Sequence, residues 1–181
     1  MPYFVRAINR ENWPEPEENA TVHDLDADAL NDIKTGENTL SVWYAESEED
    51  IKDAAVAYLG SMDKWIKSDE VEFIAIDTKY IAEATIEIFE TPNPTYVSSY
   101  ETKHRDLCGL KYDDIEAVAG IVIMSINNGK DFMLTAQEIR DLFKEVIAKG
   151  LLTSDRVDRD RHSHFRKYVQ QLEKELIALT Q

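Results

Sequence analysis

The sequence predicts an α+β fold, with a small mixed sheet and packed helices in residues 1–94 and a helical half in residues 95–181. Short segments of alternating apolar and polar residues indicate strands in the first half, whereas apolar stripes at helical spacing dominate the second. We place the boundary near Pro92 and Pro94, because prolines oppose helix and favour an extended chain. No long flexible linker separates the halves, so we expect one compact domain.

Strands and helices are expected to follow one another in the first half. Strands are predicted at residues 3–8, 39–45 and 71–76. A short helix follows Asp26, with Leu25 and Leu30 placed to form a hydrophobic staple, and a longer helix follows the potential cap Ser47. Residues 79–89 fit a helix or, in their second part, another strand.

Three helices are expected in the second half, at residues 112–126, from Thr135 to Gly150, and over 158–179. The first is apolar nearly all round, so we expect it to be the buried central helix of this half. The second has the clearest limits, because Thr135 and Glu138 can form a capping box and Gly150 can adopt a left-handed conformation.

Negative charge is the most informative bulk property. The sequence has 36 acidic and 20 basic residues, a formal net charge of −16. Residues 1–100 hold 22 of the acidic and 7 of the basic residues, so nearly all of the excess lies there. Such a field repels phosphate backbones, which argues against direct nucleic-acid binding and suits a protein partner with a basic surface. The alternative is that the charge serves solubility alone.

A short basic segment interrupts this pattern. Residues 156–167 contain five Lys or Arg and two Asp. Opposite charges in the two halves favour docking on a charged partner and would also allow a homodimer. The candidate partner-binding residues are Glu48, Glu49 and Asp50 in the acidic half and Arg156, Arg159, Arg161 and Arg166 in the basic segment.

The chain is expected to be cytoplasmic and to make no membrane contact. The single cysteine, Cys108, excludes an internal disulfide and agrees with a reducing compartment. No apolar run approaches the roughly 20 residues that span a bilayer, and the first residues lack the basic start and apolar middle of a signal peptide.

Residues 104–107, His-Arg-Asp-Leu, match the start of a kinase catalytic loop. Lys111 stands where the magnesium-binding Asn is required, and the sequence has no glycine-rich loop or Asp-Phe-Gly triplet, so we interpret the match as a polar turn at the start of a helix. His104 and Cys108 could serve as base and thiolate nucleophile from one helix face, but Gly109 argues against a helix there. A small buried thiol is the preferred interpretation.

Asp77 and Lys79 directly follow a predicted strand, an arrangement found in metal-dependent nucleases. The carboxylate would hold Mg²⁺ and the lysine would position the attacking water, with Asp63 or Glu70 as the second carboxylate. Magnesium is the cofactor under this hypothesis, and no cofactor is expected otherwise. A motif of three residues is common by chance, and the surrounding negative charge repels DNA.

No motif forms a convincing catalytic set, so the leading hypothesis is a non-catalytic, acidic protein-binding component of the immunity, inhibitor or accessory type. The first alternative is the metal-dependent nuclease or phosphodiesterase that uses Asp77 and Lys79. The second is an inhibitor whose acidic half mimics a nucleic-acid backbone and occupies a DNA-binding protein.

Overall fold

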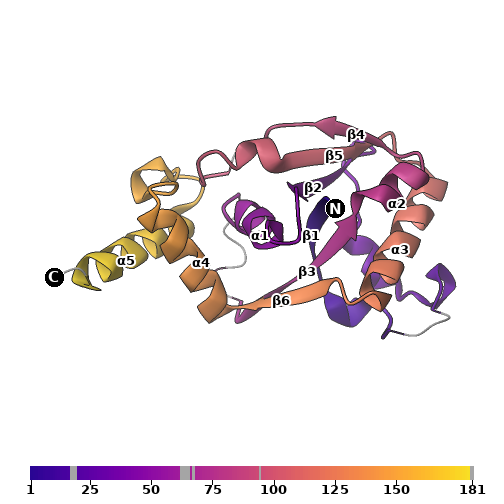
Figure 1. The fold of residues 1–181 in the computed structure, drawn as a ribbon, viewed down its shortest axis with the longest axis horizontal. Helices are drawn as coiled ribbons and strands as arrows, with labels where there is room; N and C mark the ends of the chain where they lie inside the picture. Colours follow the sequence, from indigo (N-terminus) through magenta and orange to yellow (C-terminus); the bar gives the residue numbers. More distant parts are fainter. Residues whose placement is uncertain (17–19, 62–65, 67, 94, 180–181) are drawn as a thin grey trace.

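The computed structural model describes residues 1–16, 20–61, 66, 68–93 and 95–179. At its centre lies a six-stranded sheet in the order β4-β5-β2-β1-β3-β6 (Figure 1). The strands are β1 (Tyr3–Ile8), β2 (Leu40–Ala45), β3 (Glu70–Asp77), β4 (Glu87–Glu90), β5 (His104–Cys108) and β6 (Asp131–Thr135). Together with the helices, this sheet confirms the predicted α+β class.

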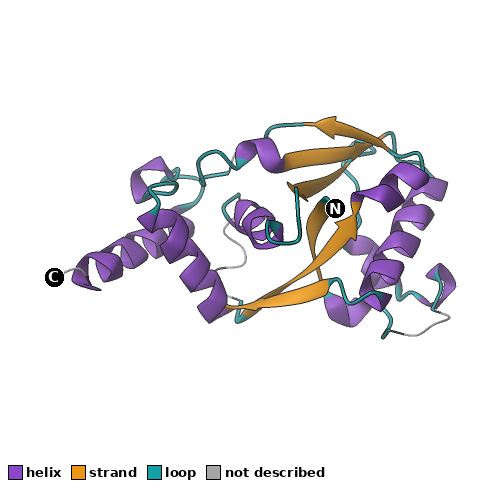
Figure 2. Cartoon of the chain, in the orientation of Figure 1, coloured by secondary structure: helices purple, strands orange, loops and turns teal. Residues whose placement is uncertain are grey.

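The sheet is covered on both faces, because β1 sends alternate side chains into two separate cores. Tyr3 and Val5 belong to one core, and Phe4 and Ile8 belong to the other. Helices pack over each face of the sheet (Figure 2). The first core includes residues of α1 (Ile51–Leu59), α4 (Ala136–Ala148) and α5 (Ser163–Leu179), and the second includes residues of η3 (Ala27–Asn31), α2 (Thr78–Glu83) and α3 (Tyr112–Asn127).

Several helix limits follow the local signals of the sequence. Thr135 and Glu138 form the expected capping box at the start of α4, and Gly150 after its end has a φ of 70°. Asp26 caps η3 by accepting a hydrogen bond from Asp28 N at 3.1 Å. The other short 3₁₀ helices are η1 (Arg10–Asn12), η2 (Val22–Asp24), η5 (Glu101–Lys103) and η6 (Ser154–Arg156).

The structure differs from the sequence prediction in the make-up of the sheet. Every strand pairing is antiparallel, so the sheet is not mixed, and residues 95–181 contribute β5 and β6 in addition to helices. The ambiguous residues 79–89 are divided, because α2 ends before Thr85, whose φ is 58°, and β4 follows.

Two helices begin later than the sequence predicts. The helix expected after Ser47 begins at Ile51, because the Ser47 hydroxyl donates to the Asp50 carboxylate at 2.9 Å and does not cap a helix. The last helix begins at Ser163, because the Asp158 carboxylate accepts hydrogen bonds from the backbone in a separate turn.

Truncation of Phe165 tests whether α5 is docked on the first core. Phe165 is fully buried and packs edge-on against Phe143 of α4, with ring centroids 5.4 Å apart. We expect Phe165→Ala to lower the free energy of unfolding by about 3–5 kcal/mol, because it removes apolar contacts and leaves a cavity. Urea denaturation measures this loss. Tyr112→Ala, at a side chain that is 82% exposed, is the control and should change stability by less than about 0.5 kcal/mol. A similarly small loss for Phe165→Ala would contradict the docking.

Candidate functional site

The candidate catalytic residues Asp77 and Lys79 bind one another at the junction of β3 and α2. Asp77 Oδ1 accepts a hydrogen bond from Lys79 N at 2.9 Å, and Asp77 Oδ2 lies 3.3 Å from Lys79 Nζ. Both carboxylate oxygens therefore have a partner within the protein. A helix cap and an ion pair account for this motif without a metal ion.

The second carboxylate that a metal site would need does not approach Asp77. Glu70 lies at the opposite end of β3, about 23 Å away along an extended strand. Asp63 lies outside the described residues. Within the described ranges, no group of three or more His, Cys, Asp or Glu side chains could hold a metal ion.

Residues 104–107 lie in β5, so their interpretation as a turn at the start of a helix is wrong. In this strand His104 pairs with Trp43 of β2. His104 and Cys108 are about 13 Å apart along the strand, too far for a base and its nucleophile. Burial also raises the pKa of the Cys108 thiol, which disfavours a reactive thiolate.

The acidic candidates Glu48, Glu49 and Asp50 precede α1 and differ in their contacts. Glu48 Oε1 lies 3.0 Å from Lys130 Nζ, and Asp50 accepts the hydrogen bond from Ser47. Hydrogen bonding by Ser47 also lowers the pKa of the exposed Glu49 carboxyl, which keeps it ionised. The charge of Glu48 is thus partly neutralised by a cation from the second half of the chain.

The basic candidates surround the start of α5, and two of them have partners within the chain. Arg166 forms an ion pair with Asp155 at 3.2 Å, and Arg156 donates a hydrogen bond to the hydroxyl of Ser98. Arg159 and Arg161 are exposed. As far as the described residues show, no ion pair joins this set to the acidic candidates before α1, so the two sets do not neutralise one another.

An apolar groove lies between residues 21–31 and α3. η2 contacts α3, and η3 continues along the same side of the molecule. The groove has a volume of about 320 Å³, and its apolar lining includes Val22, Leu25, Leu30, Tyr112, Ile115 and Ala119. Leu30 is 47% exposed and Tyr112 is 82% exposed. Leu30, which is expected to pack against Leu25 in a hydrophobic staple, therefore leaves apolar surface in contact with solvent.

Carboxylates border this groove. Asp26 and Glu116 line it together with His23, and Asp24 and Asp28 are exposed beside it. In the described part of the chain none of these four acids forms an ion pair. A backbone hydrogen bond from Thr21 lowers the pKa of Asp24, so this carboxylate stays ionised. The sequence identifies Asp26 as a helix cap, but the groove depends on the packing of a distant helix against this segment.

These features define an α+β protein with an antiparallel sheet, a helical cover on each face and an acid-bordered apolar groove. Comparison with protein-family models, with curated proteins and with solved structures finds no match for the chain. Among the residues that the structure describes, no helix combines the length and apolar character needed to cross a membrane. The geometry of the surface is therefore the basis for a functional proposal.

Substitution of Asp77 separates a structural role from metal binding. We expect Asp77→Ala to lower the free energy of unfolding by about 1 kcal/mol, because α2 loses its cap. Asp77→Asn keeps a hydrogen-bond acceptor and should lose less. Thermal unfolding with and without Mg²⁺ provides the measurement. A rise in Tm with Mg²⁺ in the parent protein that Asp77→Ala abolishes would support the metal site instead.

Proposed function

We propose that the chain is a non-catalytic, acidic protein-binding component of the immunity, inhibitor or accessory type. In this proposal the groove between residues 21–31 and α3 holds a partner segment that combines apolar and cationic side chains. One observation carries the proposal: exposed apolar side chains adjoin carboxylates that form no ion pair within the described chain.

The apolar lining supports binding of a protein rather than of a small ion. A partner that covers Leu30 and Tyr112 removes apolar surface from water, which contributes about 25 cal/mol per Å² before the entropic cost of association is subtracted. Adjoining exposed apolar side chains rimmed by polar groups are typical of interaction surfaces. The lining would therefore supply most of the affinity.

The carboxylates would select the partner. Asp24, Asp26, Asp28 and Glu116 favour a segment in which Lys or Arg flanks the apolar side chains. At physiological salt, charges are screened over about 8 Å, so these carboxylates act on cations that are close to the groove. They increase the rate of association and discriminate against acidic partners.

The apolar lining favours this function over an inhibitor that mimics a nucleic-acid backbone, because mimicry requires a row of charges without apolar surface. A second copy of the chain is a rival occupant, since its residues 156–167 are net basic. We further propose that the chain acts in the cytoplasm. The free thiol of Cys108 supports a reducing compartment.

Two synthetic peptides test the charge preference of the groove. One forms an amphipathic helix with Leu on one face and Lys on the other, and the second carries Glu in place of Lys. We expect fluorescence anisotropy to show binding of the Lys peptide that weakens as salt is added, and binding of the Glu peptide that is at least about tenfold weaker. Equal affinity for the two peptides would contradict the proposal.

Variants locate the binding surface. We expect Asp26→Asn combined with Glu116→Gln to weaken binding of the Lys peptide about threefold to tenfold. Glu70→Gln combined with Glu87→Gln removes the same charge at other exposed positions and should change binding little. Unchanged affinity of the groove variant would overturn the proposal. Sedimentation velocity should show a monomer; a dimer lost in the groove variant would make a second copy the occupant.

A further inference from the structure

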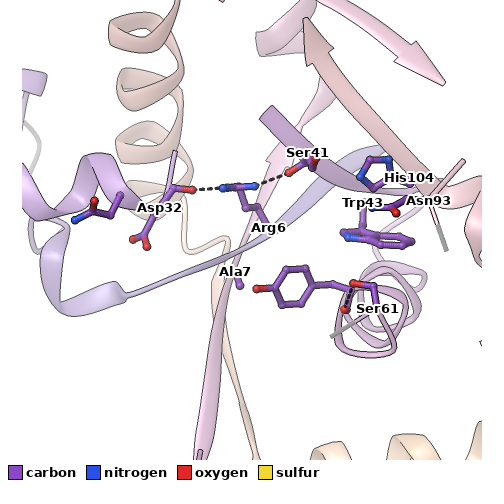
Figure 3. Close-up of a pocket in the computed structure, with 10 residues that line it drawn as sticks. Arg6, Ala7, Asp32, Ser41, Trp43, Ser61, Asn93 and His104 are labelled. Carbon is purple, nitrogen blue, oxygen red and sulfur yellow. Dashed lines mark hydrogen bonds between the residues drawn. The ribbon is translucent and has the colours of Figure 1, made fainter. Parts of the chain in front are cut away.

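β1 and β2 separate near the centre of the sheet, and the space between them opens into a pocket (Figure 3). The two strands pair through three residue pairs that end at Val5 and Trp43. Beyond that point β1 continues against β3 as far as Ile8, and β2 continues against β5 from Leu40. Backbone groups on the two sides of the gap therefore need other partners.

Arg6 occupies this gap and donates hydrogen bonds to backbone carbonyls rather than to a carboxylate. Its Nη1 donates to Ser41 O at 2.6 Å and its Nε donates to Asp32 O, so the guanidinium satisfies two backbone carbonyls (Figure 3). The Asp32 carboxylate accepts hydrogen bonds from Asn9 N at 2.8 Å and Trp13 Nε1 at 2.9 Å. Within the described chain, Arg6 forms no ion pair.

The charge of Arg6 persists despite its surroundings. Burial lowers the pKa of Arg6, but a guanidinium stays protonated at neutral pH. The bonds to Ser41 and Asp32 use two of its five N–H donors. Arg6 is partly buried, and the nearby Asp32 carboxylate favours its charge without forming an ion pair, so the remaining N–H donors are open to an anion in the pocket.

His104 supplies a second group without a partner. Its side chain is 3% exposed, and its Nδ1 lies 2.6 Å from Thr91 O, which assigns the proton to Nδ1. Nε2 is then an acceptor, and no described residue forms a hydrogen bond with it. The nearest acidic oxygen, Asp106 Oδ1, is 4.0 Å away. Trp43 packs edge-on against the imidazole, with ring centroids 5.1 Å apart.

Arg6 and His104 line one pocket of about 360 Å³, together with Tyr58, Ser61 and Asn93. Ser61, Asn93 and His104 project from different segments around this space (Figure 3). Burial raises the pKa of Tyr58, so its phenol remains protonated and can donate a hydrogen bond. Small-molecule sites commonly have volumes of about 300–1,000 Å³, and this pocket lies at the lower end of that range.

We propose that this pocket binds a small organic anion that also carries a hydroxyl group. A carboxylate or phosphate contacts Arg6, and the hydroxyl donates a hydrogen bond to His104 Nε2. A simple anion would leave Nε2 without a partner, and a neutral polyol would leave the remaining N–H donors of Arg6 without an anionic acceptor. The ligand therefore needs both groups. This inference does not depend on the function proposed for the groove.

Four probes that differ by one group test the pocket. Glycerate and glycerol 3-phosphate carry both groups, whereas inorganic phosphate and glycerol carry one each. NMR titration of the ¹⁵N-labelled chain follows the Trp43 indole N–H and the His104 ring nitrogens. We expect glycerate or glycerol 3-phosphate to bind at least about tenfold more tightly than either single-group probe and to shift the His104 Nε2 resonance. The tighter of the two identifies the anionic group.

Variants assign the contacts. Arg6→Met and His104→Phe should each weaken binding of the better probe at least about tenfold. Arg105→Met is the matched control, because Arg105 also donates to backbone carbonyls but lies over the Tyr44 ring, outside the pocket. Arg6→Met also leaves two carbonyls without donors. If it fails to fold, Tyr58→Phe, which removes one hydroxyl from the pocket, takes its place and should weaken binding.

Three results would overturn the proposal. One is the absence of saturable binding by glycerate and glycerol 3-phosphate up to about 10 mM. Another is a folded Arg6→Met or His104→Phe variant that binds the probe as tightly as the parent. If Arg6→Met does not fold, a Tyr58→Phe variant that binds as tightly as the parent has the same consequence. The third is equal affinity for inorganic phosphate and glycerol 3-phosphate, which would exclude a role for the hydroxyl group.

Discussion

The structure depends on a sheet whose central strands are buried on both faces. Such a sheet requires apolar residues at consecutive positions of its central strands, and β1 and β3 provide them in Phe4 and Val5 and in Ile74 and Ala75. A charged side chain within these strands is costly unless its hydrogen bonds are satisfied. Arg6 lies in the middle of β1, beside the gap between β1 and β2. The carbonyls of Ser41 and Asp32 accept hydrogen bonds from its guanidinium there and so offset the cost of placing a charge in this strand.

The same constraint places the groove and the pocket close together. η3 helps to cover one face of the sheet, but a helix of five residues is too short to bury all the apolar surface around it. Leu30 of η3 therefore remains exposed beside Tyr112 and lines the groove. The next residues, Asn31 and Asp32, line the pocket. One short segment thus borders both sites, and the cap formed by Asp26 fixes where it begins.

Elements with strong local signals could be predicted from the sequence, including the long strands, the capping box and the glycine that follows α4. β5 could not, because its buried residues His104 and Leu107 are three positions apart, a helical spacing. Pairing between distant segments leaves no local trace, so neither the antiparallel order nor the gap in the sheet was predictable. The sequence does mark Arg6, because it interrupts the apolar face that Phe4 and Ile8 form in β1.

A net charge of −16 is compatible with a pocket for an anion, because the two properties act over different distances. Exposed carboxylates are screened over about 8 Å at physiological salt, whereas Arg6 acts at contact distance in a less polar interior, where charges interact more strongly. Ion pairs of Glu48 with Lys130 and of Glu90 with Arg105, at 3.0 and 3.1 Å, further reduce the negative field. Net charge therefore governs which macromolecules approach the surface, and the partly buried Arg6 would set the chemistry of the ligand proposed for the pocket.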